Sequence, residues 1–473
     1  MNIDPNSSVK QKALKINLDS SIFGTFAEIG AGQEVANHFF KAGASSGTIA
    51  KTISAYDMGM SNAFYGEINS KRYVSEERLK KILSVEYNQL VSSLRNKRPD
   101  NTCFFAFANT ISAINYQKTN ESHGWIGIKF QLYPGHEPNE IFMHVKMYEK
   151  DNILQQRTLG IIGVNLIYAA FHYYNYINSF LQSLMDFTSR DNLEIDMIRM
   201  SGPELNYIDN RLLCLQLVKN NMTNAAVFDS NHNVNTPSDI FYKKNIMVLR
   251  GSFRPITYVS LDMLNKGFET FKKDNNYSGE NTMLFCEISI DNLLKDQEYD
   301  EKDFLNRVDL INGLGINVMV SDLKHHYEFV SYFDIYKIYK LGIIISSLTL
   351  SDLFKKEFYR NLSGGVFEGI GKLFKNNVKM YVYPAKQAGT DELLTSENLK
   401  IEDETRHIYQ YILETNKLSQ IKNVDKEKLN IFSKIVLKYI QDGNSEWEQM
   451  VPPYISESIK AKHMFGYNDN NNG

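Results

Sequence analysis

The second half of the chain alternates between short apolar runs and stretches with helical periodicity. The runs at 245–250, 283–290, 316–321 and 341–346 are almost continuously apolar. Continuous apolar runs between helices are typical of strands that are buried on both faces of a parallel sheet. The pattern therefore predicts a parallel βα-repeat domain over 191–400, and both a barrel and an open doubly wound sheet fit it.

The first half has a different pattern. Three aromatic runs, 103–114, 125–133 and 140–148, are separated by polar turns and alternate in places between apolar and polar residues. This favours an antiparallel meander. Apolar residues at helical spacing predict a long helix over 75–95. We expect an α/β protein whose residues 1–190 form an N-terminal α+β region.

The borders of these regions are read from the same pattern. The strand-like segment LEIDMIRM (193–200) is expected to be the first strand of the parallel domain. Residues 401–473 are expected to form a helical tail that ends in a disordered Asn-rich stretch at 468–473. The segment 159–185 contains no charged side chain and is long enough to cross a bilayer. Its many amides would be costly in hydrocarbon, so we expect buried helices and no membrane span.

Composition excludes some partners. The chain has 52 basic and 55 acidic side chains, whereas a general binder of nucleic acid carries a clear basic excess. We therefore expect no nucleic-acid partner. The three cysteines are far apart and form no CxxC pair, which provides neither a disulfide framework nor a thiolate zinc site and fits a reducing cytoplasm.

Two glycines form the first candidate site. In EIGAGQEV (28–35), Gly30 and Gly32 follow a predicted strand and precede a predicted helix. Glycines at such a turn let backbone N–H groups approach a phosphate at the helix N-terminus. The third glycine of the dinucleotide fingerprint is Val35 here. The alternative is a tight turn with close helix packing.

The second candidate is RGSFRPIT (250–257), between a predicted strand and a predicted helix. It resembles the GxFxPxH element of the nucleotidyltransferases that include nicotinamide-mononucleotide adenylyltransferase. The final histidine of that element is Ser260 here, and Thr257 stands where its first histidine often stands. The residues expected to contact a ligand are Arg250, Gly251, Ser252, Arg254 and Thr257.

The second element of those transferases, ISSTxxR, has a partial counterpart in Ile345-Ser346-Ser347-Leu348, where the arginine position is Ser351. Without the histidine and the arginine, little fixed positive charge remains for a phosphoryl-type transition state. Arg250 and Arg254 could supply this positive charge instead. The alternative is a strand-to-helix loop with solvated arginines.

Several stretches together resemble one widespread bacterial family over residues 22–386. They are FGTFAEIGAGQEV, SAYDM, HGWIGIKFQ, DNRLLCLQLV and RGSFRPIT. Genome labels for that family include nicotinamide- or nicotinate-nucleotide adenylyltransferase and TonB-dependent receptor. The second label conflicts with the dominant βα alternation, because an outer-membrane barrel needs many alternating ten-residue strands. The resemblance implies a shared fold and no settled activity.

Several histidines in the first half of the chain are possible metal ligands. His136 and His144 lie in the predicted meander near His123, with Glu137 and Glu140 close in sequence. They share no compact ligand motif, so no metal site is predicted. No Ser/His/Asp set is legible in the sequence.

Two functions remain open. The first is binding of a nucleotide-like or phosphate-bearing ligand, possibly with nucleotidyltransferase-like activity, and with no cofactor assigned beyond a possible nucleotide. The second is a non-catalytic interaction or self-assembling protein whose aromatics form interfaces, because 28 Tyr and 28 Phe residues give an aromatic content of 12%. A homo-oligomer is expected in either case. Whether 28–35 and 250–257 share one cleft is left open.

Overall fold

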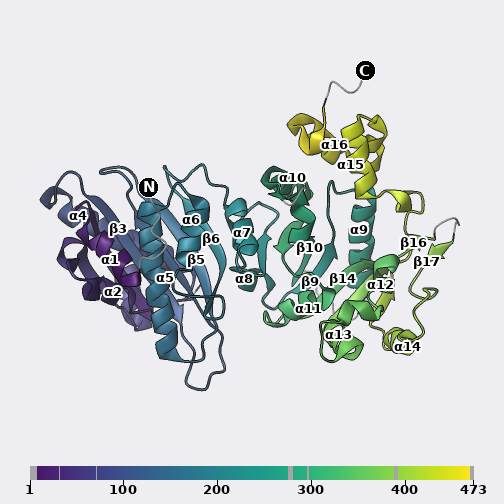
Figure 1. Ribbon diagram of the computed structural model, residues 1–473, viewed down its shortest axis with the longest axis horizontal. Coiled ribbons are helices and arrows are strands. Elements are labelled where there is room, and N and C mark those ends of the chain that lie inside the picture. The colour runs from purple at the N-terminus through teal and green to yellow at the C-terminus, as the bar shows by residue number, and fades with distance from the viewer. Residues whose placement is uncertain are drawn as a thin grey trace. The chain divides into compact units, whose positions relative to one another are not determined.

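The computed structural model describes residues 8–30, 32–70, 72–274, 281–295, 298–387 and 392–468. Apart from Asn468, the predicted Asn-rich stretch 468–473 lies outside these residues. The chain divides into two compact units, Met1–Thr223 and Asn224–Gly473, called unit 1 and unit 2 below. Both combine sheets and helices (Figure 1), which confirms the predicted α/β class.

Unit 1 contains a six-stranded sheet with the order β2-β1-β3-β4-β5-β6. β1 pairs in parallel with β2 and β3, and the remaining pairs are antiparallel. The predicted meander is therefore confirmed as β3, β4 and β5. The strands are β1 (Ile22–Gly30), β2 (Ile49–Ile53), β3 (Cys103–Ser112), β4 (Ser122–Phe130), β5 (Asn139–Met147) and β6 (Leu193–Ser201).

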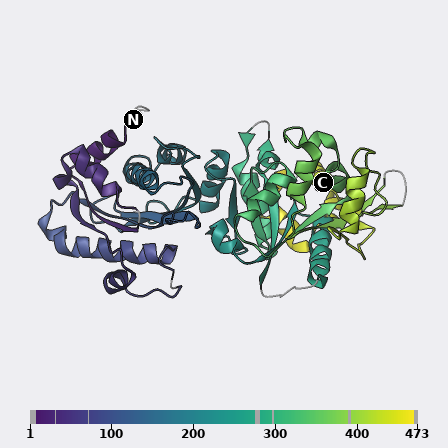
Figure 2. The ribbon, with the colours of Figure 1, turned by 90° about the horizontal axis from the view of Figure 1, so that it is seen from below.

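Helices cover both faces of this sheet (Figure 2). The predicted long helix is α4 (Glu76–Leu94), which begins at the N-cap Ser75 and packs on β1, β3 and β4. The opposite face carries α5 (Asn152–His172), which packs against its neighbouring helices and β4. The other helices are α1 (Val9–Leu18), α2 (Val35–Ala42), α3 (Met58–Tyr65), α6 (Ile177–Leu184) and α7 (Asn210–Lys219).

The uncharged segment 159–185 belongs to α5 and α6, and most of the α5 side chains are buried within unit 1. None of the helices in the described ranges is long and apolar enough to span a membrane.

The border between the units differs from the predicted one. The strand expected to open the parallel domain is β6, which pairs antiparallel with β5 at the edge of the first sheet. β6 is almost entirely buried and α7 packs on it, and burial favours strand-forming apolar residues whether a strand is parallel or antiparallel. The division after Thr223 thus places 193–223 in unit 1.

Unit 2 is built on an eight-stranded sheet with the order β18-β15-β14-β9-β10-β13-β7-β8. The six strands from β18 to β13 are parallel. β7 and β8 are antiparallel, although they lie within the range 191–400 that was predicted to be a parallel domain. The strands are β7 (Ala225–Phe228), β8 (Val234–Asn235), β9 (Asn245–Arg250), β10 (Thr282–Ser289), β13 (Asn317–Ser321), β14 (Lys340–Ser346), β15 (Val378–Tyr383) and β18 (Leu418–Gln420).

The parallel strands follow a doubly wound order. Numbered along the chain from β9, they lie in the order 3-2-1-4-5-6, and the sheet has β18 and β8 at its two edges within the described residues. Of the two alternatives that the sequence left open, the structure has the open doubly wound sheet. In this topology the chain leaves β9 towards one edge and resumes at β14 towards the other.

Helices pack on both faces of the second sheet as well. α9 (Tyr258–Lys273) covers β9, β14 and β15, and α10 (Glu301–Asn312) contacts β13. The remaining helices are α8 (Pro237–Phe241), α11 (His326–Asp334), α12 (Ser347–Asp352), α13 (Gly365–Leu373), α14 (Arg406–Glu414), α15 (Ser433–Asp442) and α16 (Pro453–Lys462). Two small hairpins pair β11 (Leu294–Lys295) with β12 (Glu298–Tyr299) and β16 (Ala385–Lys386) with β17 (Leu393–Leu394).

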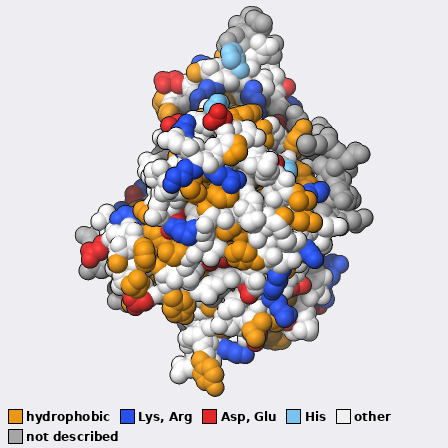
Figure 3. All heavy atoms as spheres, turned by 90° about the vertical axis from the view of Figure 1, so that its left-hand side faces the viewer, with side chains coloured by type: hydrophobic (Ala, Val, Ile, Leu, Met, Phe, Trp, Pro, Cys, Tyr) orange, Lys and Arg blue, Asp and Glu red, His pale blue; other side chains and the backbone are white. Residues whose placement is uncertain are grey.

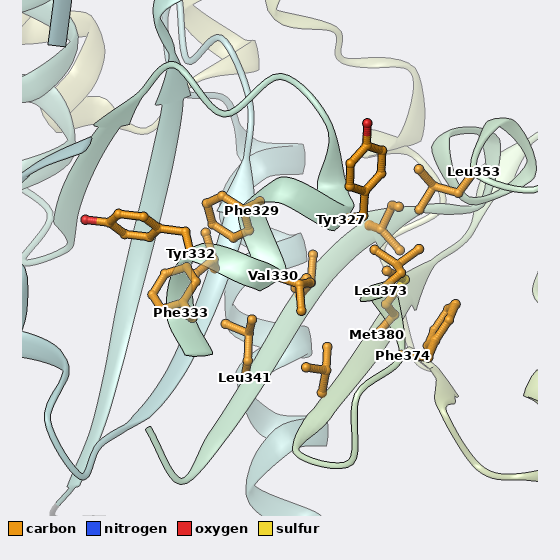
Figure 4. Close-up of a cluster of buried hydrophobic side chains, with 14 of the residues drawn as sticks. Tyr327, Phe329, Val330, Tyr332, Phe333, Leu341, Leu353, Leu373, Phe374 and Met380 are labelled. Carbon is orange, nitrogen blue, oxygen red and sulfur yellow. The ribbon is translucent and has the colours of Figure 1, made fainter. Parts of the chain in front are cut away.

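Aromatic residues of α11 form part of the unit 2 core. Phe329 and Phe333 are almost fully buried and pack with Tyr332 beside the apolar strands β9 and β14 (Figure 4). The high aromatic content in this part of the chain is therefore core packing.

The residues after 401 are more than a helical tail. β18 adds to the edge of the sheet beside β15, and Trp447 is 1% exposed. Ser433, at the first position of α15, bonds to the loop after β9. This segment is an integral part of unit 2.

Candidate ligand site at the switch in strand order

The doubly wound strand order identifies one position in unit 2 where a ligand site is expected, at the carboxyl ends of β9 and β14. β9 and β14 are adjacent and parallel, with Leu249 opposite Ile344, so both strands end at the same edge of the sheet. Open α/β sheets bind ligands outside the carboxyl ends of the strands where the winding direction reverses. The segment 251–257 follows β9, and Ser346 is the last residue of β14, with Ser347 directly after it. The two sequence elements that resemble nucleotidyltransferase motifs are thus placed at this switch point.

The loop after β9 is compact. The Gly251 N–H bonds to the Glu287 carbonyl at 3.0 Å and so continues the ladder with β10. Phe253 is 4% exposed and has a left-handed backbone with φ of 47°. Its ring lies so close to Gly251 that a Cβ there would come within 3.1 Å of it. Glycine at 251 therefore makes room for the buried ring.

Arg250 is held in place by several contacts. Its Nε lies 2.8 Å from Glu287 Oε2, its Nη2 lies 2.5 Å from the Leu323 carbonyl, and its guanidinium stacks on Phe329. Glu287 is 1% exposed and also accepts a bond from Ser321. The third nitrogen, Nη1, is buried with no hydrogen-bond partner among the described residues. Nη1 of Arg250 is therefore a donor nitrogen that a ligand could use, although Glu287 compensates the charge of the guanidinium.

Arg254 and the Ser252 carbonyl contact a second group of charged side chains, formed by Asp303 and Arg307. Arg254 Nε lies 2.5 Å from Asp303 Oδ1, and Asp303 also pairs with Arg307. Arg307, which is 2% exposed, donates from Nη1 to the Ser252 carbonyl at 3.0 Å. Burial lowers the pKa of Arg307, and the carboxylate of Asp303 opposes this. Two arginines thus share one carboxylate beneath the loop.

The start of α9 is capped from within the chain. Thr257 is the N-cap, and its hydroxyl accepts the Ser260 N–H at 3.4 Å. Ser260 is therefore the third residue of the helix, where the resembling transferases have a histidine. The Ser433 hydroxyl donates to the Pro255 carbonyl at 2.8 Å and accepts the Arg254 N–H at 3.0 Å.

The segment after β14 has one unsatisfied hydroxyl. Ser346 caps α12 by accepting the Thr349 N–H at 3.1 Å. Ser347 is fully buried, and its hydroxyl has no hydrogen-bond partner among the described residues. A buried polar group without a partner is uncommon and calls for an explanation such as an absent ligand or water.

The other candidate turn belongs to unit 1. The Glu28 carboxylate accepts the N–H groups of Val35 and Ala36, at 2.7 and 3.1 Å, and so occupies the start of α2. Burial raises the pKa of Glu28 to about 7, against the lowering effect of these two bonds. The Glu28 side chain already occupies the N–H groups that a phosphate would need, and Gly30 has a φ of 82° that suits glycine. This geometry favours the tight turn, and ligand binding at Gly30 and Gly32 stays a prediction.

Sequence reasoning missed several residues of the unit 2 site. Asp303 and Arg307 are an i,i+4 pair on α10, a spacing that the sequence shows but that does not reveal the partner loop. Ser433 lies 178 residues from Pro255 along the chain, and no local signal connects them. No group of three or more possible metal ligands occurs within the described ranges.

Comparisons with known proteins give little further information. No family model matches the sequence, and no curated protein matches it. Solved structures similar to part of the chain include the competence/damage-inducible protein CihA from Agrobacterium tumefaciens, with 16% identity, 39% of this chain and 99% of the other covered, and a TM-score of 0.24. A competence or damage-inducible protein from Enterobacter asburiae has 12% identity, covers 35% and 99%, and has a TM-score of 0.26. TM-scores this low support no inference about this chain.

Proposed function

We propose that unit 2 binds a nucleotide or another small phosphate-bearing ligand at the carboxyl ends of β9 and β14. The supporting observation is the position of the glycine-containing loop 251–257 at the switch of a 3-2-1-4-5-6 sheet. This is where doubly wound folds bind such ligands, with the phosphate at the N-terminus of the following helix. α9 is 16 residues long, so its dipole favours an anion there.

Three further groups support the proposal. Arg250 Nη1 and the Ser347 hydroxyl are buried donors without partners among the described residues, and they lie at the carboxyl ends of the adjacent strands β9 and β14. A phosphate oxygen is a strong acceptor for such donors. Asp291, whose side chain is 52% exposed, follows β10, the second strand of the winding order. Doubly wound dinucleotide folds hold a ribose hydroxyl with an acidic residue in that region.

Binding is better supported than nucleotidyl transfer. Transfer needs positive charge aimed at the phosphates in the transition state. The first candidate, Arg250, is paired with Glu287, and Arg254 shares Asp303 with Arg307. Ser260 and Ser351 stand where the resembling transferases have a histidine and an arginine. We therefore propose a binding module, with transfer as the less supported extension.

Replacing Ser260 by Glu tests the phosphate site. Glu at the third helical position completes a capping box with Thr257 and places its negative charge at the helix start, so the fold should keep or gain stability. The same charge would repel a bound phosphate. The variant should bind ATP, ADP or nicotinamide mononucleotide at least about tenfold more weakly than the native chain in thermal-shift and calorimetric titrations.

Ser260→Gln is the matched control. The Gln side chain has the same shape as Glu and completes the same capping box with Thr257, but it carries no charge. The nucleotide affinity of this variant should therefore stay close to that of the native chain. Equal affinity of all three proteins would place the ligand elsewhere. The absence of any nucleotide or phosphate binding by the native chain would contradict the proposed function.

The alternative, an assembly protein, is supported by exposed apolar residues around α3. Tyr56 is 75% exposed, Met58 59%, and Met60 and Phe64 50% each. On the face of unit 1 shown in Figure 3, apolar side chains are separated by charged and other polar ones. Aromatic residues and methionine are enriched at interfaces. A defined oligomer in light scattering together with a null nucleotide titration would favour this function.

A further inference from the structure

A row of four polar side chains crosses four adjacent strands of unit 1. Ser112 at the end of β3 lies directly opposite His123 on β4. His123 Nδ1 lies 3.1 Å from His144 Nε2 on β5, and His144 Nδ1 lies 2.5 Å from Asp196 Oδ1 on β6. Directly opposed residues of antiparallel strands point to the same face, with Cβ atoms about 5 Å apart. The Ser112 hydroxyl and the His123 ring are therefore neighbours on one face.

A β-bulge places the acidic member of this row. His144 is opposite Met197 and Val145 is opposite Ile195, so Asp196 is an extra residue between them. The bulge turns its carboxylate towards His144 and towards Lys146, whose Nζ lies 3.2 Å away. Bulges of this kind often re-aim a side chain next to an active site. The carboxylate is 1% exposed and ionised between two basic partners.

The hydrogen bonds define the direction of the chain. Because a carboxylate accepts, His144 donates from Nδ1 to Asp196, and its Nε2 then accepts from His123 Nδ1–H. This arrangement assigns the basic lone pair of His123 to Nε2, an assignment inferred from the network. Burial alone would raise the pKa of Asp196, but His144 and Lys146 outweigh it and lower that pKa to about 2.

Burial decreases along the row. Asp196 and His144 are buried, and the Trp125 ring lies 5.1 Å from that of His144, which fixes its orientation. His123 and Ser112 are only half-buried. A buried, oriented base chain that ends at a partly exposed histidine next to a hydroxyl is the arrangement that activates a serine nucleophile.

We propose that this row is an acyl-transfer site of unit 1 that hydrolyses small carboxylic esters. Ser112 Oγ attacks the ester carbonyl carbon while its proton passes to His123 Nε2. The ester C–O bond then breaks, and the leaving alkoxide takes that proton as it departs as the alcohol. Water then attacks the acyl carbon while His123 Nε2 takes its proton. The bond between that carbon and Ser112 Oγ breaks, the proton passes from His123 to Oγ, and the acyl group leaves as the acid. His144 and Asp196 are positioning residues that hold His123 in its tautomer and share its positive charge.

The site was not predictable from the sequence, in which no Ser/His/Asp set is legible. The four residues are spread over 112–196, and only the pairing of β3, β4, β5 and β6 brings them together. The proposal concerns unit 1 and does not depend on ligand binding by unit 2.

A fluorophosphonate probe tests the proposal on the full chain. The Ser112 oxygen should form a bond to phosphorus as the P–F bond breaks, fluoride leaves, and the serine proton passes to His123. Intact-mass and peptide analysis should show one adduct, on Ser112, and none in Ser112→Ala. His123→Ala should slow labelling by at least about 100-fold. Added imidazole should restore part of that rate, which a purely structural role of His123 would not produce.

Two further variants distinguish a positioning role of Asp196 from a purely structural one. Asp196→Asn should slow labelling by a factor on the order of 10²–10⁴ through the wrong tautomer of His144. Because the variant also removes the charge partner of Lys146, the rates are compared at a temperature where its circular dichroism shows it to be folded. His136→Ala is the matched control, because His136 pairs with Glu204 at 3.0 Å in the same unit but lies outside the row. It should be labelled at the native rate. Absence of a Ser112 adduct in the folded native chain, or native-rate labelling of His123→Ala, would overturn the proposal.

Discussion

Replacing Asp303 by Ala should lower the free energy of unfolding of unit 2 by about 3–5 kcal/mol. Asp303 is 5% exposed and is the shared partner of Arg254 and Arg307. Arg307 is 2% exposed, so removal of the carboxylate would leave its charge buried and uncompensated. Such a charge costs far more than the lost bond itself, because water cannot reach it.

Hydrogen exchange of α10 peptides in the full chain measures this loss, together with urea unfolding. Glu269→Ala is a suitable control, because its pair with Lys266 is exposed and should contribute at most about 1 kcal/mol. The double variant Asp303→Ala/Arg307→Met should lose less than Asp303→Ala, since it removes the unpaired charge as well. A single-variant loss below 1 kcal/mol would mean that water solvates Arg307.

The stability of unit 1 should decrease between pH 4.5 and pH 7 through Glu28. Burial raises the pKa of Glu28 from 4.5 to about 7. Within this window the folded chain holds a proton that the unfolded chain has lost, so stability falls as pH rises. The stabilisation is complete below pH 4.5, where both states are protonated. A shift of this size corresponds to about 3 kcal/mol.

Glu28→Gln isolates this effect, since its amide does not titrate. Hydrogen exchange of β1 and α2 peptides measures the opening free energy of both proteins. From pH 4.5 to pH 7.5 the native chain should lose about 3 kcal/mol of opening free energy relative to Glu28→Gln. Glu137→Gln, at an exposed position of the same unit, should show no such change relative to the native chain. A difference that stays constant with pH would show that Glu28 is ionised throughout.

The fold was predictable where burial and periodicity act locally. The apolar runs at 245–250 and 341–346 predicted buried parallel strands, and the helical spacing over 75–95 predicted α4. The segment 193–200 is also strand-like, although it contains three charged residues, and it is antiparallel, because strand direction depends on a partner distant in the chain. The choice between barrel and open sheet likewise depends on strand order, which no local pattern encodes.

The candidate site was predictable only in part. The motif around Gly251 identified the loop, and the topology explains its position at the switch between β9 and β14. The sequence could not show that Glu287 and Asp303 neutralise the two arginines offered as phosphate ligands. Those pairings depend on side chains brought together by sheet order and by helix packing.

The central claim is that the switch point of unit 2 holds a nucleotide, and photo-crosslinking tests it most directly. The full chain would be irradiated with 8-azido-ATP, with unlabelled ATP as competitor, and the adducts mapped by peptide mass analysis. We expect competed adducts in 251–264 or 346–350, the segments at the carboxyl ends of β9 and β14. Adducts confined to other segments, or adducts that ATP does not displace, would contradict a nucleotide site at this edge.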